Sequence, residues 1–281
     1  PKAIRVYDIP LGTTFQGMWN SLLKLFPLYL LLHFFCTLKW TFNCVAPCQN
    51  RKRMIQLMCT FSTKGKTISI FPSFEVNTPI IYLNTFSNEG QKVFKAAQAA
   101  GFPSFTLVTI SDLDWNHDMV PWDSSPALKN AAPCTGGADD YLRLLTEEII
   151  PTAEKEIDGA PRWRGVAGYS LAGLFALYAI YQTDLFSRVG SMSGSLWFPS
   201  MKKYIFSHEP KHWPDCMYFS LGDKESKTRN PILRSVRQNT EDIQSFFQDK
   251  VIDTVFQLNP GNHYNHAVDR TAAGLCWLLS R

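Results

Sequence analysis

This sequence of 281 residues lacks an excess of charge of one sign, internal repeats and low-complexity segments. Lysine and arginine total 28 and aspartate and glutamate total 24, so the net charge is only +4. So small and scattered an excess argues against a nucleic-acid partner, which would need a clustered basic surface. Hydrophobic residues make up 45% of the chain, which excludes disordered, collagen-like and coiled-coil proteins.

Metal-binding patterns and a disulfide framework are also lacking. The 7 cysteines are odd in number and have no repeated spacing, so we expect reduced thiols and a cytoplasmic location. Cys44 and Cys48 have no second Cys/His pair at zinc-site spacing. His208 and His212 fit the pattern His-Glu-x-x-His, but Pro210 would break the helix that this chemistry needs. We therefore expect neither a metal nor a cofactor.

Long hydrophobic runs are confined to the N-terminal part of the chain. Residues 1–58 are expected to form a separate segment of unassigned role, apolar and rich in cysteine from about residue 17. As a helix, the stretch from Leu25 to Leu38 would span roughly 20 Å, which is short of the ~30 Å hydrocarbon layer of a membrane. This favours a buried or surface-lying element, and membrane association through residues 22–46 is the alternative.

From residue 59 to the C-terminus, strand and helix patterns alternate. A hairpin is expected around Lys64–Lys66. Further strands are expected at 79–83, 105–110, 165–168, 189–192, 217–221 and 254–258. Helices are expected before Gly101 and at 141–157, with a kink at Pro151, 171–181, 231–249 and 267–280. This alternation predicts an α/β domain over residues 59–281, with a doubly wound, mostly parallel sheet flanked by helices. Functional residues of such sheets lie at the carboxyl ends of the strands.

The segment Gly-Tyr-Ser-Leu-Ala-Gly at 168–173 follows a predicted strand and opens a strongly apolar helix. This is the context of a nucleophile elbow, in which Ser170 would sit on a tight, strained turn. Such a turn brings the positions two before and two after the serine together, so both must be small, as Gly168 and Ala172 are. The N–H of Leu171 at the helix start is the expected oxyanion donor. A plain β-to-α turn with a serine cap is the alternative.

A serine nucleophile needs a base to accept its proton and an acid to orient that base. His263 follows the last predicted strand and is the expected base, with His266 as the alternative. Glu225 follows another predicted strand and is the expected acid, with Asp223 as the alternative. The chain order Ser170, Glu225, His263 is the order expected for this kind of site.

Further candidates lie after other strand ends. The second oxyanion donor is expected in the loop after the strand at 79–83, and we assign it to Phe86, within the stretch Thr85, Phe86 and Ser87. Three tryptophans are expected to line a substrate pocket, with core packing as the alternative: Trp115, Trp122 and Trp197.

Four separated sequence motifs together resemble those of a known family. They are Gly-Tyr-Ser-Leu-Ala-Gly-Leu-Phe-Ala-Leu-Tyr from 168, Ser-Met-Ser-Gly-Ser-Leu-Trp from 191, Leu-Gly-Asp-Lys-Glu from 221, and Gly-Asn-His from 261. Together they resemble the esterase family related to enterochelin and salmochelin esterases, a group that also includes feruloyl esterases and mycolyltransferases. The resemblance runs from about residue 60 to the C-terminus. It implies an α/β-hydrolase fold with a Ser-His-acid site and no cofactor. Ala172 departs from the family's more common glycine.

We therefore expect a serine esterase that hydrolyses a small-molecule carboxylic ester, such as a siderophore-type ester, through an acyl-enzyme. Two alternatives stay open. An acyltransferase of the same fold would differ only in whether an alcohol outcompetes water, and a binding or scaffold protein would keep the fold without catalysis.

Overall fold

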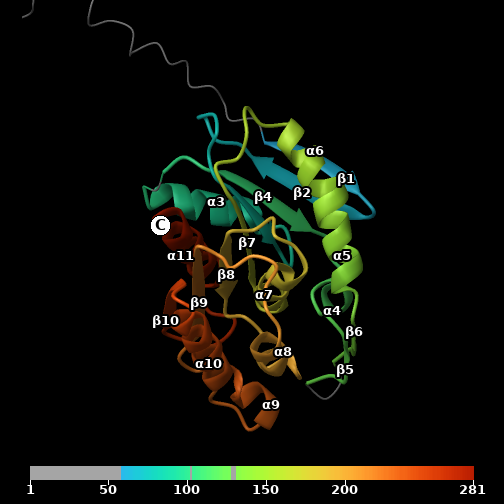
Figure 1. Ribbon diagram of the computed structural model, residues 1–281, viewed down its shortest axis with the longest axis vertical. Coiled ribbons are helices and arrows are strands. Elements are labelled where there is room, and N and C mark those ends of the chain that lie inside the picture. Colours follow the sequence, from blue (N-terminus) through green and yellow to red (C-terminus); the bar gives the residue numbers. More distant parts are fainter. Residues whose placement is uncertain (1–57, 102, 128–130) are drawn as a thin grey trace, which may run out of the picture. The chain divides into compact units, whose positions relative to one another are not determined.

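The computed structural model describes residues 58–101, 103–127 and 131–281 (Figure 1). Its main sheet contains β1 (Cys59–Thr63), β2 (Lys66–Phe71), β3 (Ile80–Asn84), β4 (Thr106–Ser111), β7 (Arg164–Tyr169), β8 (Arg188–Met192), β9 (Cys216–Gly222) and β10 (Asp253–Asn259). Their spatial order is β1-β2-β4-β3-β7-β8-β9-β10. β2 is antiparallel to β1 and to β4, and every other pairing in the sheet is parallel. The predicted mostly parallel α/β sheet is confirmed.

The connections carry helices and one short strand pair. The helices are α3 (Gly90–Ala99), α4 (Trp115–Asp118), α5 (Ala138–Leu144), α6 (Ile150–Lys155), α7 (Leu171–Gln182), α8 (Met201–Ser207), α9 (Pro231–Arg234), α10 (Val236–Asp249) and α11 (Ala267–Leu279). The pair is β5 (Asp123–Ser124) with β6 (Cys134–Thr135). A π-helical turn, Leu145–Ile149, joins α5 to α6. It lies just before Pro151, where a kink is expected because proline has no N–H to donate.

Most expected elements are found within a residue or two of their predicted bounds. The hairpin forms β1 and β2, with Thr63 opposite Lys66. The helix expected at 231–249 is instead two helices, α9 and α10, because the helix is interrupted at Ser235. Helix α8 was not expected. Its seven residues are too few to show a helical period in the sequence.

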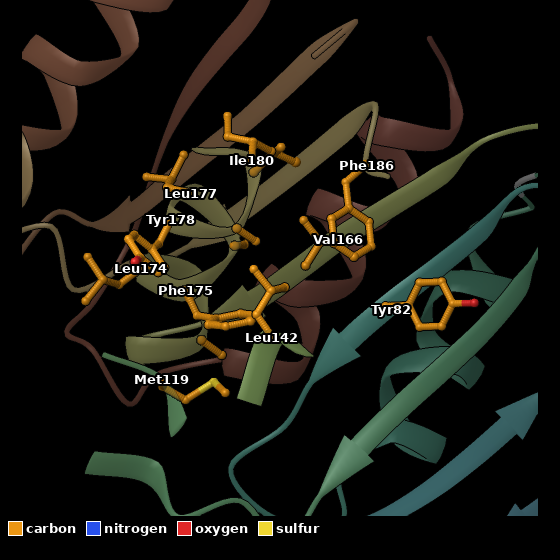
Figure 2. Packing of buried hydrophobic residues seen from close by; sticks show 14 of the residues in the cluster. Tyr82, Met119, Leu142, Val166, Leu174, Phe175, Leu177, Tyr178, Ile180 and Phe186 are labelled. Atoms are coloured by element: carbon orange, nitrogen blue, oxygen red, sulfur yellow. The ribbon is translucent and has the colours of Figure 1, made fainter. Parts of the chain in front are cut away.

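Side chains of the central strands alternate between two hydrophobic clusters, one on each face of the sheet. On β3, Ile80 and Tyr82 belong to the larger cluster, and Ile81 and Leu83 to the smaller one. The larger cluster packs against α5, α7, α8 and α10, and the smaller against α3 and α11. Figure 2 shows the larger cluster, with Phe175 among the α7 side chains that fill it. Helices on both faces confirm the doubly wound arrangement.

The N-terminal segment, residues 1–58, lies outside the described residues except for Met58. The boundary at residue 58 and the membrane alternative at 22–46 therefore stay predictions. In the ranges that the structure describes, no helix combines the length and apolar character needed to cross a membrane.

Candidate active site

Ser170 stands at the turn between β7 and α7. Its backbone has φ 61° and ψ −124°, a conformation that costs a non-glycine residue about 1–3 kcal/mol. A Cβ on Gly168 would overlap the backbone and the Cβ of Ala172, which is why both positions must be small. Two backbone hydrogen bonds tie the turn to the segment after β8, from Ser170 N to Met192 O at 3.1 Å and from Ser195 N to Ser170 O at 3.0 Å. This is the geometry expected of a nucleophile elbow.

The support for this strained turn comes from α7. Every residue from Leu171 to Tyr181 is buried, with side chains in the larger hydrophobic cluster. Burying a large aliphatic or aromatic side chain contributes about 1.5–3 kcal/mol. Packing along α7 therefore outweighs the strain at one residue and keeps the Ser170 hydroxyl at the end of the sheet.

Hydrogen bonds join Ser170, His263 and Glu225 in a chain. Ser170 Oγ lies 3.0 Å from His263 Nε2, and His263 Nδ1 lies 2.8 Å from Glu225 Oε2. The structure thus brings together three residues that are far apart in the sequence. By contrast, the alternative base His266 has a side chain that is 73% exposed and 3.5 Å from Asp269.

The carboxylate of Glu225 is buried and accepts several hydrogen bonds from protein donors. Its Oε1 accepts hydrogen bonds from Gly222 N at 2.5 Å and from Ser193 Oγ at 2.8 Å. Burial alone would raise the pKa of Glu225, but the hydrogen bond and charge of His263, together with these donors, lower it below its ordinary value. An ionised Glu225 only accepts hydrogen bonds, so His263 Nδ1 carries the proton of that bond. In a neutral imidazole with this tautomer, Nε2 is the acceptor that faces the Ser170 hydroxyl.

Asp223, the alternative acid, has a different neighbour. Its Oδ1 accepts a hydrogen bond from Gly261 N at 2.7 Å, and its Oδ2 lies 3.9 Å from Lys227 Nζ. The first bond ties the turn after β9 to the loop that carries His263. Asp223 therefore shapes that loop, whereas Glu225 contacts the imidazole.

The expected oxyanion donors differ in their surroundings. Leu171 is the first residue of α7, so its N–H has no partner within the helix and stands beside Ser170. Phe86 N, in the loop after β3, donates to Glu89 Oε1 at 3.1 Å. In that loop Thr85 N donates to Ile110 O at 2.9 Å and Ser87 N to Glu89 Oε2 at 2.9 Å. The Phe86 N–H can bind an oxyanion only if its hydrogen bond to Glu89 is broken. The assignment of Phe86 as the second oxyanion donor stays a prediction.

The three tryptophans expected to line a pocket are partly buried and pack against the larger cluster. Trp115 meets the exposed ring of Phe86 edge to face, with centroids 5.1 Å apart. Trp122 donates from Nε1 to Pro199 O and packs on Phe198, and Trp197 also packs on Phe198. Trp122 and Trp197 thus take part in core packing, and their role in a pocket stays a prediction.

Sequence reasoning assigned no role to four residues that contact this site. Tyr169 donates from its hydroxyl to His263 O at 2.6 Å, and Ser195 Oγ lies 3.3 Å from Ser170 Oγ. Ser193 donates to Glu225, as described above, and Arg270 of α11 lies 3.3 Å from the same carboxylate oxygen. Tyr169, Ser193 and Ser195 lie inside the motifs that carry the family resemblance, and this position is the sequence signal that could have identified them. Arg270 lies outside them.

Three comparisons with known proteins bear on this geometry. A protein of Bacillus subtilis (strain 168), "Uncharacterized protein YbbA", is 24% identical over 194 residues, which cover 66% of this chain and 78% of that protein. The siderophore hydrolase EstA from Aspergillus nidulans matches with a TM-score of 0.61 at 16% identity, over 80% of this chain and 94% of that chain. An IroE-like serine hydrolase from Shewanella oneidensis matches with a TM-score of 0.64 at 16% identity, over 80% of each chain.

At these identities, the similarity to solved structures shows that the fold is shared, and this fold is of the α/β-hydrolase type. The family assignment comes from the sequence. The model of the family Esterase, described as "Putative esterase", matches residues 83–267, which is more than half of the chain. The matched range contains the elbow at Ser170, the turn with Glu225 and the loop with His263, and the chain belongs to this esterase family.

Proposed function

We propose that this protein is a serine carboxylester hydrolase that works through an acyl-enzyme. One observation carries the proposal: the hydrogen-bonded chain from Ser170 through His263 to Glu225 at the carboxyl ends of the strands. A serine, an imidazole and a carboxylate at these distances are the groups that acyl transfer requires.

The first half of the reaction forms the acyl-enzyme. Ser170 Oγ attacks the ester carbonyl carbon while its proton passes to His263 Nε2. The carbonyl π electrons move to the oxygen, and the Leu171 N–H stabilises the resulting oxyanion. Collapse of this intermediate breaks the bond to the alcohol oxygen, which takes the proton from His263 as it leaves. Glu225 keeps Nδ1–H in place and stabilises the imidazolium throughout.

The second half repeats the same proton transfers with water. His263 Nε2 removes a proton from a water molecule, whose oxygen attacks the acyl carbon. The tetrahedral intermediate collapses with release of the carboxylic acid, and His263 returns its proton to Ser170 Oγ. The products are one alcohol and one acid for each ester.

The proposed substrate is a siderophore-type or other small ester. Support comes from EstA, which is named a siderophore hydrolase, and from two exposed aromatic rings, one against the imidazole and one in the loop after β3. Tyr264 is 84% exposed and meets the His263 ring edge to face at 5.4 Å, and Phe86 is 70% exposed. Such rings suit an aromatic or apolar group on the substrate.

A cytoplasmic location belongs to the same proposal. It is supported by the odd number of cysteines and by the free thiols of the cysteines in the described ranges, which are Cys59, Cys134, Cys216 and Cys276.

The test is labelling of the full chain by a fluorophosphonate probe, with identification of the modified residue. We expect phosphonylation of Ser170, and none in Ser170→Ala. Hydrolysis is then measured on catecholate siderophore lactones, short acyl p-nitrophenyl esters and feruloyl esters. We expect Ser170→Ala to lose about 10³-fold or more in kcat. If the wild-type chain shows neither labelling nor hydrolysis, the result would favour the binding protein. Acyl transfer to an added alcohol at the expense of hydrolysis would favour the acyltransferase.

A further inference from the structure

A buried arginine lies behind the candidate triad without contacting Ser170. Arg270 is in the first turn of α11, and its side chain is 3% exposed. Moving a guanidinium out of water costs several kcal/mol unless its partners are well placed. The positions of those partners therefore indicate what the residue does.

The guanidinium reaches the three segments that carry the site. At the acid it meets Glu225 Oε1 at 3.3 Å, and it also lies 3.3 Å from Ser193 Oγ, which follows β8 and itself donates to Glu225. From the loop that carries the histidine it meets Asn262 O at 3.1 Å and Pro260 O at 2.9 Å. From the elbow it meets the Tyr169 hydroxyl at 3.2 Å.

Tyr169 extends this contact to the base. Its hydroxyl accepts from Arg270 Nη1 and donates to His263 O at 2.6 Å. Burial raises the pKa of Tyr169, so the phenol keeps the proton that it donates. A Cβ on Gly222 would meet the guanidinium of Arg270 and the carbonyl oxygen of Gly261, so a glycine at this position leaves room for the cluster.

A second buried arginine shows what a structural role looks like in this chain. Arg188, at the start of β8, has a relative exposure of 8%, donates to the carbonyl of Leu278 and lies over the ring of Trp163 at 3.9 Å. For both arginines, Nε has no acceptor in the part of the chain that the structure describes. They differ in where their guanidinium groups lie, because Arg188 is at the amino ends of the strands and Ser170 follows the carboxyl end of β7.

We propose that Arg270 is a positioning residue that holds Glu225 and the His263 loop in the geometry needed for proton transfer. This inference rests on the proposed esterase function. Arg270 binds Glu225 through Oε1, which leaves Oε2 for His263 Nδ1. A planar guanidinium meets these acceptors in directions that one ammonium group cannot reproduce. Because small misplacements of catalytic groups cost about 10²-fold, we expect the effect to appear in kcat.

The charge of Arg270 has a second consequence. It offsets part of the negative charge of Glu225, which would otherwise favour the imidazolium form of His263. The other charged groups of the surrounding loops include Lys224, the pair Asp223–Lys227 and the pair His266–Asp269. Within the described residues, none of them forms a hydrogen bond or ion pair with the imidazole. Loss of the cation should therefore move the acid limb of the kcat/KM profile to higher pH.

The experiment compares Arg270→Ala and Arg270→Lys with Arg188→Ala and Arg188→Lys as matched controls. For each full-chain variant we would measure the midpoint of urea unfolding, the rate of phosphonylation of Ser170, and kcat and KM on a p-nitrophenyl ester across pH. The Arg188 variants should lose stability and keep wild-type kcat and acid limb. Arg270→Ala should lose about 10²-fold in kcat with KM within about twofold, and should shift the acid limb. Arg270→Lys should recover only part of the rate.

Chemical rescue adds a test that a general packing defect would not pass. Guanidinium at low millimolar concentration should restore part of the rate of Arg270→Ala and leave Arg188→Ala unchanged. If Arg270→Ala keeps wild-type kcat and acid limb, or if it loses activity only in proportion to stability with no rescue, the inference is wrong.

One readout separates failure of this inference from failure of the proposed function. The Nδ1 proton of His263, hydrogen-bonded to Glu225, should give a downfield proton NMR signal in the wild-type chain, whether or not any ester is hydrolysed. Loss of this signal in Arg270→Ala but not in Arg188→Ala would support positioning even if the wild-type chain proved inactive. An unchanged signal with unchanged labelling would overturn the inference while the esterase proposal stood. If Arg270→Ala does not fold, the same comparison is made with the Lys variants.

Discussion

The hydroxyl of Tyr169 donates to the carbonyl oxygen of His263 at 2.6 Å. The residue immediately before the candidate nucleophile thus holds the backbone of the candidate base, 94 positions further along the chain. Because Arg270 binds the same hydroxyl and also Glu225, the three members of the site are fixed by shared neighbours as well as by their own hydrogen bonds.

Replacement of the acid should separate Glu225 from Asp223. We expect Glu225→Gln to lower kcat by about 10³–10⁴-fold, because an amide can no longer fix the imidazole tautomer. Asp223→Asn should lose about tenfold or less, because Asp223 bonds to Gly261 N and not to the imidazole. Steady-state rates of the two variants on one ester decide the matter. Equal losses would count against Glu225 as the acid.

The depressed pKa of Glu225 makes a prediction about stability. A carboxyl group whose pKa is lowered in the folded state stabilises it above the unfolded pKa, which is ordinarily 4.5. This contribution is lost as the pH falls through the lower, folded value. The difference in free energy of unfolding between wild type and Glu225→Gln should therefore be constant from pH 7 down to about 5 and shrink below 4.5. Urea unfolding across this range measures it, and a difference that grows toward low pH would contradict the prediction.

Gly168 should tolerate no side chain. A methyl group there would overlap Ala172, so we expect Gly168→Ala to lower the free energy of unfolding by about 1–3 kcal/mol and to reduce the rate of Ser170 phosphonylation. Ala172→Gly is the matched change, since it removes one of the colliding atoms. The double variant should recover part of the loss but not all of it, because backbone atoms of residue 172 also collide. No recovery would show that the Ala172 methyl is not involved.

Ser195 should contribute to the rate through its hydroxyl. In the proposed mechanism the Ser170 proton goes to His263, which makes Ser195 the donor in the 3.3 Å contact between the two serines. We expect Ser195→Ala to lower kcat about tenfold, which corresponds to about 1.4 kcal/mol for one hydrogen bond, with KM unchanged. The control is Ser191→Ala, a buried serine whose Oγ has no partner among the described residues. Similar rates in both variants would contradict the prediction.

Much of the fold could be predicted from local patterns. The parallel strands are short apolar runs, β3 being buried at all five positions, and the elbow combines a strand, two small residues and an apolar helix. Periodicity could not reveal α8, which is too short, or the break at Ser235, where both the N–H and the hydroxyl of Ser235 donate to Ile232 O.

The site was less accessible to sequence reasoning. Ser170 and His263 follow strand ends and could be placed, but Glu225 and Asp223 are two positions apart in one loop, and only their three-dimensional neighbours distinguish them. Arg270 could not be found, since its partners lie up to 101 positions away and no local pattern marks a buried cation. The Phe86 N–H was expected to face a substrate, yet it donates to Glu89, because a carboxylate three positions on can fold back onto the loop.

The packing that supports Ser170 and the exposed side chains around the candidate site lie in different parts of this structure. Helix α7 lies wholly in the interior from Leu171 to Tyr181, whereas two aromatic side chains are exposed: Tyr264, which contacts the His263 ring, and Phe86, in the loop after β3. Laboratory evolution of ester preference can therefore act on these two surface positions without disturbing the packing beneath Ser170.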